Sequence, residues 1–125
     1  MKMSELDRRA EGLKAYADQL GMSVSEIETY FLTNYGSPFS ESAFLAAGGG
    51  NWKENELSLR ERSLIVISVL TTLGGVDDRL KGHLKWAFKH DLDQKDLEAA
   101  FSLIANYAGF ARASVAVDIL NEIDK

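Results

Sequence analysis

Apolar residues recur along the chain with the spacing of an α-helix, and no segment sustains the alternation of a half-buried strand. The first half therefore predicts helices over residues 4–20, 23–35 and 38–47. Ser4 opens the first helix as a capping residue, and Ser23 with Glu26 has the spacing of a capping box for the second. Gly21 and Gly36 follow these two helices directly, and glycine is the usual residue at a helix end.

The second half predicts four further helices, over residues 59–73, 78–90, 93–108 and 110–123. Capping boxes open two of them, formed by Ser58 with Glu61 and by Asp93 with Asp96. Residues 64–70 are apolar nearly all round the helix, which is typical of a central, buried element. Asp77 or Asp78 is expected to cap the helix that follows. The pattern predicts an all-α bundle of six or seven helices.

The run Gly48-Gly49-Gly50 separates the two halves of the chain. No Lys-Ser or Lys-Thr follows it, so the run does not complete a phosphate-binding loop, and a flexible hinge is the better interpretation. Fifty residues alone make a poor hydrophobic core. We therefore expect one domain over residues 1–125, with an N-terminal helical extension over 1–50 and a core over 51–125.

The amino-acid composition excludes several classes of function. The 125 residues carry a net charge of −5 with no basic cluster, so nucleic acid is not an expected partner. Cysteine is absent and histidine occurs twice, which excludes thiol chemistry and a multi-histidine metal site within one chain. No cofactor is expected. The N-terminus has no apolar signal segment and the longest apolar run is too short to cross a bilayer, so we expect a cytoplasmic protein without a membrane partner.

His83 is the first candidate for chemistry, because it falls within the apolar stripe of the helix over residues 78–90. Two interpretations stay open. One is a packed core histidine hydrogen-bonded to a carbonyl group, and the other is a neutral imidazole that faces a pocket, its pKa lowered by burial. Arg79 lies four residues earlier on the same side, where it would attract an anion or simply pair with a nearby acid.

Four further residues are candidates for substrate binding. Arg60 and Arg62 occupy the first helical turn after Ser58, a position that the helix dipole disfavours for cations, so a salt bridge or an anionic ligand is expected to hold them. Tyr107 stands in the small-residue stretch Asn106–Ala113, which is either a tight helix junction or a pocket wall. Trp52, like Trp86, is flanked by polar residues, as aromatics at an interface or a pocket rim often are.

The ordered segments "LSLRERSLIVISVLTTLGG" and "HLKWAFKHDLDQKDLEAAFSLIANYAGFARASVAV" resemble the carboxymuconolactone decarboxylase family. The matching pattern is Leu-x-x-Arg-x-Arg at 57–62, His-x-x-x-Ala at 83–87, an acidic cap at 93–96 and Tyr-x-Gly at 107–109. The upstream "GNWKENELS" is similar to the family's glycine–tryptophan approach. The resemblance spans roughly residues 50–122 and implies an alkylhydroperoxidase D-like fold that assembles into homotrimers or homohexamers.

The resemblance also implies two chemistries. Thiol peroxidases of the family use Cys-x-x-Cys, but Val76 and Arg79 occupy those positions here, so that activity is excluded. The other branch is a cofactor-independent carboxy-lyase that decarboxylates γ-carboxymuconolactone in aromatic catabolism. In that branch His83 is the matching acid or base, and arginines are candidate clamps for the substrate carboxylate.

Two positions depart from the decarboxylase pattern. Arg79 stands where those enzymes usually have Glu, which reverses the charge, and Ala111 stands where they tend to have Pro. Two functions therefore stay open. The chain is either a decarboxylase of a small anionic lactone, or a non-redox homo-oligomeric binding protein with a vestigial pocket.

Overall fold

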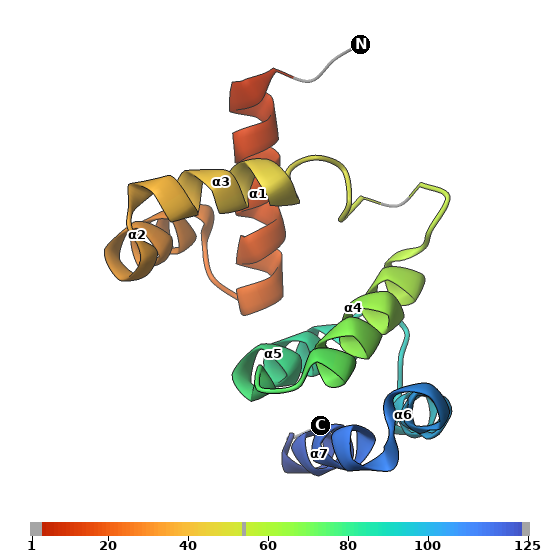
Figure 1. The fold of residues 1–125 in the computed structure, drawn as a ribbon. Coiled ribbons are helices and arrows are strands. Elements are labelled where there is room, and N and C mark those ends of the chain that lie inside the picture. The colour runs from red at the N-terminus through yellow and green to blue at the C-terminus, as the bar shows by residue number, and fades with distance from the viewer. Residues whose placement is uncertain (1–3, 54, 124–125) are drawn as a thin grey trace. The chain divides into compact units, whose positions relative to one another are not determined.

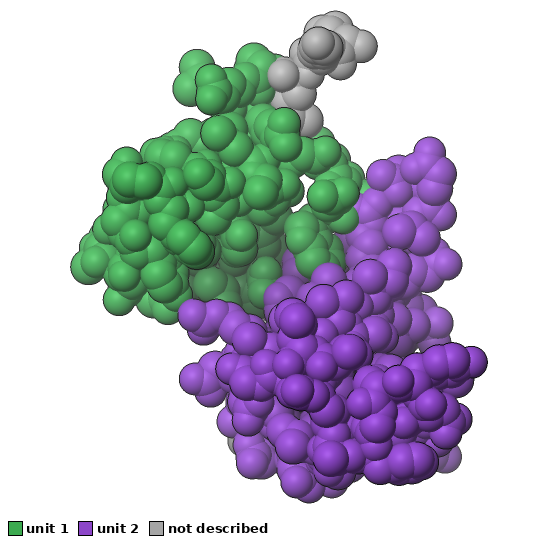
Figure 2. Space-filling model, viewed as in Figure 1, with its two compact units in different colours: residues 1–53 green, residues 54–125 purple. Residues whose placement is uncertain are grey.

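The computed structural model describes residues 4–53 and 55–123, and within these ranges it contains seven helices and no strand (Figure 1). The predicted all-α fold is confirmed. The chain divides into two compact units, residues 1–53 and 54–125 (Figure 2). That these units form a single domain stays a prediction. Within the described residues, no helix is long and apolar enough to cross a membrane.

The N-terminal unit consists of α1 (Glu5–Leu20), α2 (Val24–Tyr35) and α3 (Ser37–Ala47). Both predicted caps are present: Ser4 accepts a hydrogen bond from the Asp7 amide, and Ser23 with Glu26 forms a complete capping box. Because the apolar stripes of the three helices converge, they share one small core, built from Leu13, Ala17, Ile27, Phe31 and Phe44.

Helices α1 and α3 cross closely at two glycines. A Cβ at Gly12 would lie 1.8 Å from the Phe44 carbonyl oxygen, and a Cβ at Gly48 would lie 1.7 Å from the Arg8 carbonyl oxygen. Glycine is therefore required at both positions for the backbones to approach. Gly48 is buried and packed against α1, and the division between the two units falls after residue 53, so the hinge role of residues 48–50 stays a prediction.

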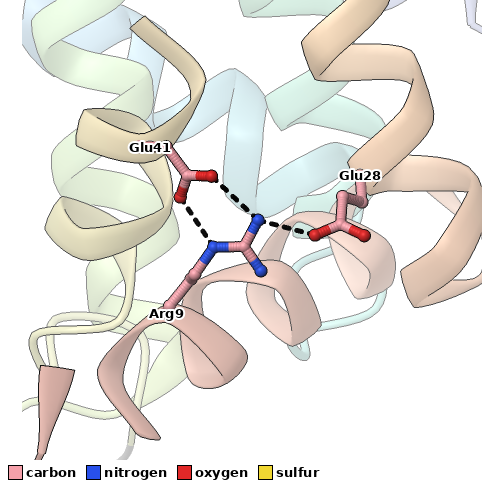
Figure 3. Close-up of polar contacts among 3 residues, drawn as sticks. All are labelled: Arg9, Glu28 and Glu41. Carbon is pink, nitrogen blue, oxygen red and sulfur yellow. Dashed lines mark hydrogen bonds and ion pairs between the residues drawn. The ribbon is translucent and has the colours of Figure 1, made fainter. Parts of the chain in front are cut away.

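Arg9 joins the three helices of this unit through two carboxylates (Figure 3). Its Nε donates to Glu41 Oε2 at 2.6 Å, and the same terminal nitrogen donates to Glu41 Oε1 at 2.9 Å and to Glu28 Oε2 at 2.6 Å. The planar guanidinium matches a carboxylate in this paired geometry. The bonds from Arg9 hold the pKa of the Glu41 carboxyl below its ordinary value.

The C-terminal unit consists of α4 (Leu59–Leu73), α5 (Asp77–Ala87), α6 (Gln94–Ala108) and α7 (Phe110–Glu122). Helix α7 packs against the other three, and α4 packs against both α5 and α6 (Figure 1). The apolar faces meet in one core, which includes Ile67, Leu84, Leu97, Phe101, Ala116 and Leu120. Since α5 and α6 lie on different sides of α4 and α7, residues on these two helices face different parts of the unit.

Two expectations for this unit were wrong. Helix α4 is not buried all round, because Ile65, Val69 and Leu73 on it are 49%, 51% and 62% exposed. Neither Asp77 nor Asp78 caps α5: Val76 occupies the N-cap position, and no side-chain cap hydrogen bond is made there. Val76 is preceded by Gly74 and Gly75, both of which have positive φ.

Candidate functional site

His83 lies on α5 at the edge of its apolar stripe. Its neighbours Leu80, Leu84 and Ala87 are buried, whereas His83 itself is only partly buried. Removal of the ring from water lowers the pKa of His83 below its ordinary value of 6.5. The free protein at neutral pH therefore presents a neutral imidazole here.

Arg79 shares this side of α5 with His83, one helical turn earlier. It is exposed, and it lines a shallow hollow of about 490 Å³ together with Gly75, Val76, Asp77 and Asp78. His83 and Arg79 are the two sequence candidates that the structure places together on one helix face.

An aromatic and polar cluster lies beneath His83. The ring centroids of His83 and Trp86 are 6.1 Å apart, and those of Trp86 and His90 are 4.8 Å apart. His90 Nδ1 lies 2.8 Å from the Oγ of Ser63 on α4, and both residues are buried. Trp86 is 3% exposed, so its interpretation as an exposed interface or rim residue was wrong. This cluster fixes the part of α5 that carries His83.

The two arginines of α4 make contacts within the C-terminal unit. Arg60 is exposed and forms an ion pair with Asp96 at 3.5 Å, and its Nε donates to the Asp91 carbonyl oxygen at 3.2 Å. Arg62 is buried and donates to Asn55 Oδ1. These contacts fix the start of α4 to the start of α6 and to the segment that precedes α4. Both arginines therefore take part in polar contacts within the unit, and their contact with an anionic ligand stays a prediction.

Tyr107 and Trp52 belong to other segments than His83. Tyr107 is 89% exposed on α6, where it lines a groove against Ser68 and Thr72 of α4. Arg60 lines the neighbouring groove between α4 and α6, and His83 belongs to neither groove. Trp52 is partly buried in the N-terminal unit, in the turn after α3. The structure thus separates Arg60 and Tyr107 from the α5 face that carries His83.

Sequence reasoning missed the contacts that support this face. The sequence indicated that His90 was structural or exposed, but neither its pairing with Ser63 nor the contact of Arg62 with Asn55 was predicted. Two signals were present: a serine at the start of an apolar helix, and a histidine seven residues after His83, two helical turns along the same face. Within the described residues, no group of three or more His, Asp or Glu side chains is arranged to hold a metal ion.

The family model for the carboxymuconolactone decarboxylase family matches residues 40–122 of this chain. The chain belongs to the carboxymuconolactone decarboxylase family. The match begins ten residues before the resemblance expected from the sequence and includes part of α3. Family membership agrees with the observed all-α architecture, which is of the alkylhydroperoxidase D-like type.

A curated relative extends the similarity to nearly the whole chain. It is 4-carboxymuconolactone decarboxylase from Acinetobacter baylyi (strain ATCC 33305 / BD413 / ADP1), to which this chain is 26% identical over 123 residues. The alignment covers 98% of this chain and 91% of the relative, so it includes the N-terminal unit. No solved structure matches the chain significantly.

Proposed function

We propose that this protein is a cofactor-independent decarboxylase of a small anionic lactone, with His83 as the proton-transfer residue. The observation that carries the proposal is the pairing of a partly buried histidine of lowered pKa with an exposed arginine on the same face of α5. Membership of the family and the name of the A. baylyi relative support the same class of reaction.

The chemistry assigns a role to each side chain. When the carbon–carboxylate bond breaks, CO₂ leaves and the electron pair is delocalised into the conjugated lactone as an enolate. Arg79 would hold the anion in position and offset its charge. A bound anion near His83 favours the protonated ring, so the imidazolium would then donate its proton to the enolate carbon. One proton is consumed, one CO₂ is released, and no redox step is required.

The other sequence candidates have smaller parts in this proposal. Arg62 and Arg60 would stabilise α4, against which α5 packs. Substrate contacts by Arg60, Arg62, Tyr107 and Trp52 stay predictions.

A decarboxylation assay tests the proposal directly. Purified wild-type protein and His83→Ala are incubated with γ-carboxymuconolactone, and CO₂ release and lactone consumption are followed together. Lys85→Ala is the matched control, because Lys85 is exposed and lies two residues along α5 on the opposite side of the helix. We expect turnover by the wild type and the control, and at least a hundredfold loss in His83→Ala. Absence of wild-type turnover, or equal rates in all three, would reject the role of His83 with this substrate.

Arg79 supports a second candidate function, a homo-oligomeric binding protein that holds an anion without converting it. A cation four residues before His83 is suited to retaining an anionic ligand. Measuring both binding and turnover of γ-carboxymuconolactone distinguishes the two functions. Saturable binding without CO₂ release, weakened by Arg79→Ala and unaffected by His83→Ala, favours the binding protein.

We also propose that the protein self-associates through the face formed by α4 and α6. This α4–α6 face carries exposed apolar side chains on both helices, namely Ile65, Val69, Leu73, Leu103 and Tyr107. Two grooves of about 380 and 280 Å³ run between the helices and are lined mainly by apolar residues. Contiguous apolar surface of this kind is usually covered in an assembly, and a homotrimer or homohexamer is the state expected for this family.

A further inference from the structure

Helix α4 carries an apolar ridge that the structure leaves exposed. The ridge consists of Ile65, Val69 and Leu73, which recur every fourth residue and therefore line up along one side of the helix. Beside it, the grooves between α4 and α6 are lined by apolar side chains, Leu64 and Leu103 among them. The α4–α6 face thus presents a ridge and a groove next to each other.

The groove is suited to an apolar occupant, although two hydroxyl groups lie along it. Ser68 Oγ donates to the Leu64 carbonyl at 2.7 Å, and Thr72 Oγ1 donates to the Ser68 carbonyl at 2.8 Å. Both hydroxyl donors are therefore satisfied within α4 itself. An apolar side chain can cover them without leaving a donor unpaired, so a polar ligand has no advantage over an apolar ridge here.

The ridge is complementary to a second copy of itself. If two α4 helices pack antiparallel about a twofold axis at the level of Ile67, Val69 of one copy lies opposite Ile65 of the other, and Leu73 lies opposite Glu61. The equal spacing of these positions means that apolar side chains meet at the centre of the contact. Each ridge can then lie in the groove of the other copy, which is the ridge-into-groove packing common between helices.

The charges at the two ends of α4 favour the antiparallel arrangement. Glu61 is exposed at the start of the helix, and the exposed Arg112 is held at its end, where its guanidinium donates to the Leu73 carbonyl at 2.9 Å. Antiparallel copies bring Glu61 of each to Arg112 of the other, whereas parallel copies would bring like charges together. Arg60, the other exposed cation at the start, is paired with Asp96 at 3.5 Å within its own copy.

We infer that two copies of this chain pack through their α4 ridges, antiparallel about a twofold axis, with each ridge in the α4–α6 groove of the other copy. The inference rests on the self-association proposed above and adds the symmetry of the contact. A homohexamer contains twofold axes and a homotrimer contains none. Of the two proposed assemblies, this contact therefore selects the hexamer.

A single introduced cysteine tests the twofold contact, because the chain has no cysteine of its own. Val69→Cys places one thiol beside the proposed axis, so a short bismaleimide should join it to the same thiol of a second copy. The expected product is a covalent dimer on a denaturing gel. Ser114→Cys is the nearly isosteric control: it is exposed on α7, lines neither groove, and should remain a single chain on the gel.

The mass of the wild type, measured by light scattering, separates this inference from the proposed self-association. A hexamer whose Val69→Cys variant is cross-linked supports the twofold contact. A trimer, or a hexamer whose Val69→Cys variant is not cross-linked, overturns the contact while self-association stands. A monomeric wild type at micromolar concentration overturns both. The decarboxylation assay is independent of each of these results.

Two neutralising variants test the antiparallel direction. Glu61→Gln removes the charge but can keep the capping bond with the Ser58 amide, and Arg112→Gln removes the opposite charge. Each should weaken the association of twofold-related copies about threefold, measured by sedimentation velocity over a dilution series. The double variant should be no weaker than either single variant, because both remove the same contact. Additive effects of the two substitutions overturn the antiparallel pairing.

Discussion

The Oγ of Ser63 lies 2.8 Å from Nδ1 of His90, and this buried contact joins α4 to the turn that follows α5. The His90 ring packs in turn on Trp86, three residues after His83. The placement of the proposed catalytic histidine therefore depends on a serine that is distant in sequence and contacts no substrate in the proposed mechanism.

Ser63→Ala is expected to destabilise the protein by about 1–3 kcal/mol, because the buried Nδ1 of His90 loses its hydroxyl partner. Urea unfolding followed by circular dichroism measures the change. Ser102→Ala is the matched control on the exposed side of α6 and should change stability by less than about 0.5 kcal/mol. Similar effects of the two substitutions would show that the Ser63–His90 contact contributes little.

Two glycine substitutions should act in opposite directions. Gly12→Ala places a methyl group against the Phe44 carbonyl and should destabilise the N-terminal unit by about 1–3 kcal/mol. Gly82→Ala lies in the interior of α5 with no atom within 4 Å of the new Cβ, and it should stabilise the protein by about 0.5–1 kcal/mol. Thermal unfolding of both variants checks the signs. A stable Gly12→Ala would contradict the close crossing of α1 and α3.

Glu41 should make stability depend on pH. Its pKa is lower in the folded protein because Arg9 donates to it, so the stabilisation is present above the unfolded pKa and is lost as pH falls through the folded one. Urea unfolding from pH 7 to pH 3 measures this loss. The difference between wild type and Glu41→Gln should be largest at neutral pH and should shrink toward pH 3. A constant difference would show that the ion pair does not lower the pKa of Glu41.

The pH profile of decarboxylation should report the protonation of His83. Because the proposed donor is the imidazolium and burial lowers its pKa, kcat/KM should fall as pH rises through a midpoint below 6.5. The midpoint for kcat should lie higher, since the bound anion favours the charged ring. Steady-state rates measured from pH 5 to pH 8 give the midpoints of kcat/KM and of kcat. An increase of kcat/KM with pH over the same range would assign His83 as a base instead.

A charge placed in the α4–α6 face should reduce self-association. Leu103→Glu puts a carboxylate on an exposed apolar position of that face, and it should convert a trimer or hexamer into smaller species. Light scattering coupled to size-exclusion chromatography measures the mass. Leu6→Glu is the control, because Leu6 is also an exposed leucine (79%, against 61% for Leu103) but lies on α1. A monomeric wild type at micromolar concentration would reject the proposed assembly.

Local signals in the sequence predicted the helices closely. The capping boxes at Ser23 and Ser58 and the glycines at Gly21 and Gly36 specify helix ends through hydrogen bonds and backbone conformations that involve only neighbouring residues. The cap of α5 was predicted wrongly because an aspartate near the start of a helix has the same local signature whether it lies at the cap or in the first turn.

The sequence by itself determined the all-α class, most of the helix boundaries, the absence of thiol chemistry and the resemblance to a family that the comparison then showed. Only the tertiary structure decided which side chains meet. It paired Ser63 with His90 and joined Arg60 to Asp96. The reason is physical: periodicity specifies the face on which a residue lies, whereas its partner across the core depends on how helices distant in sequence pack together.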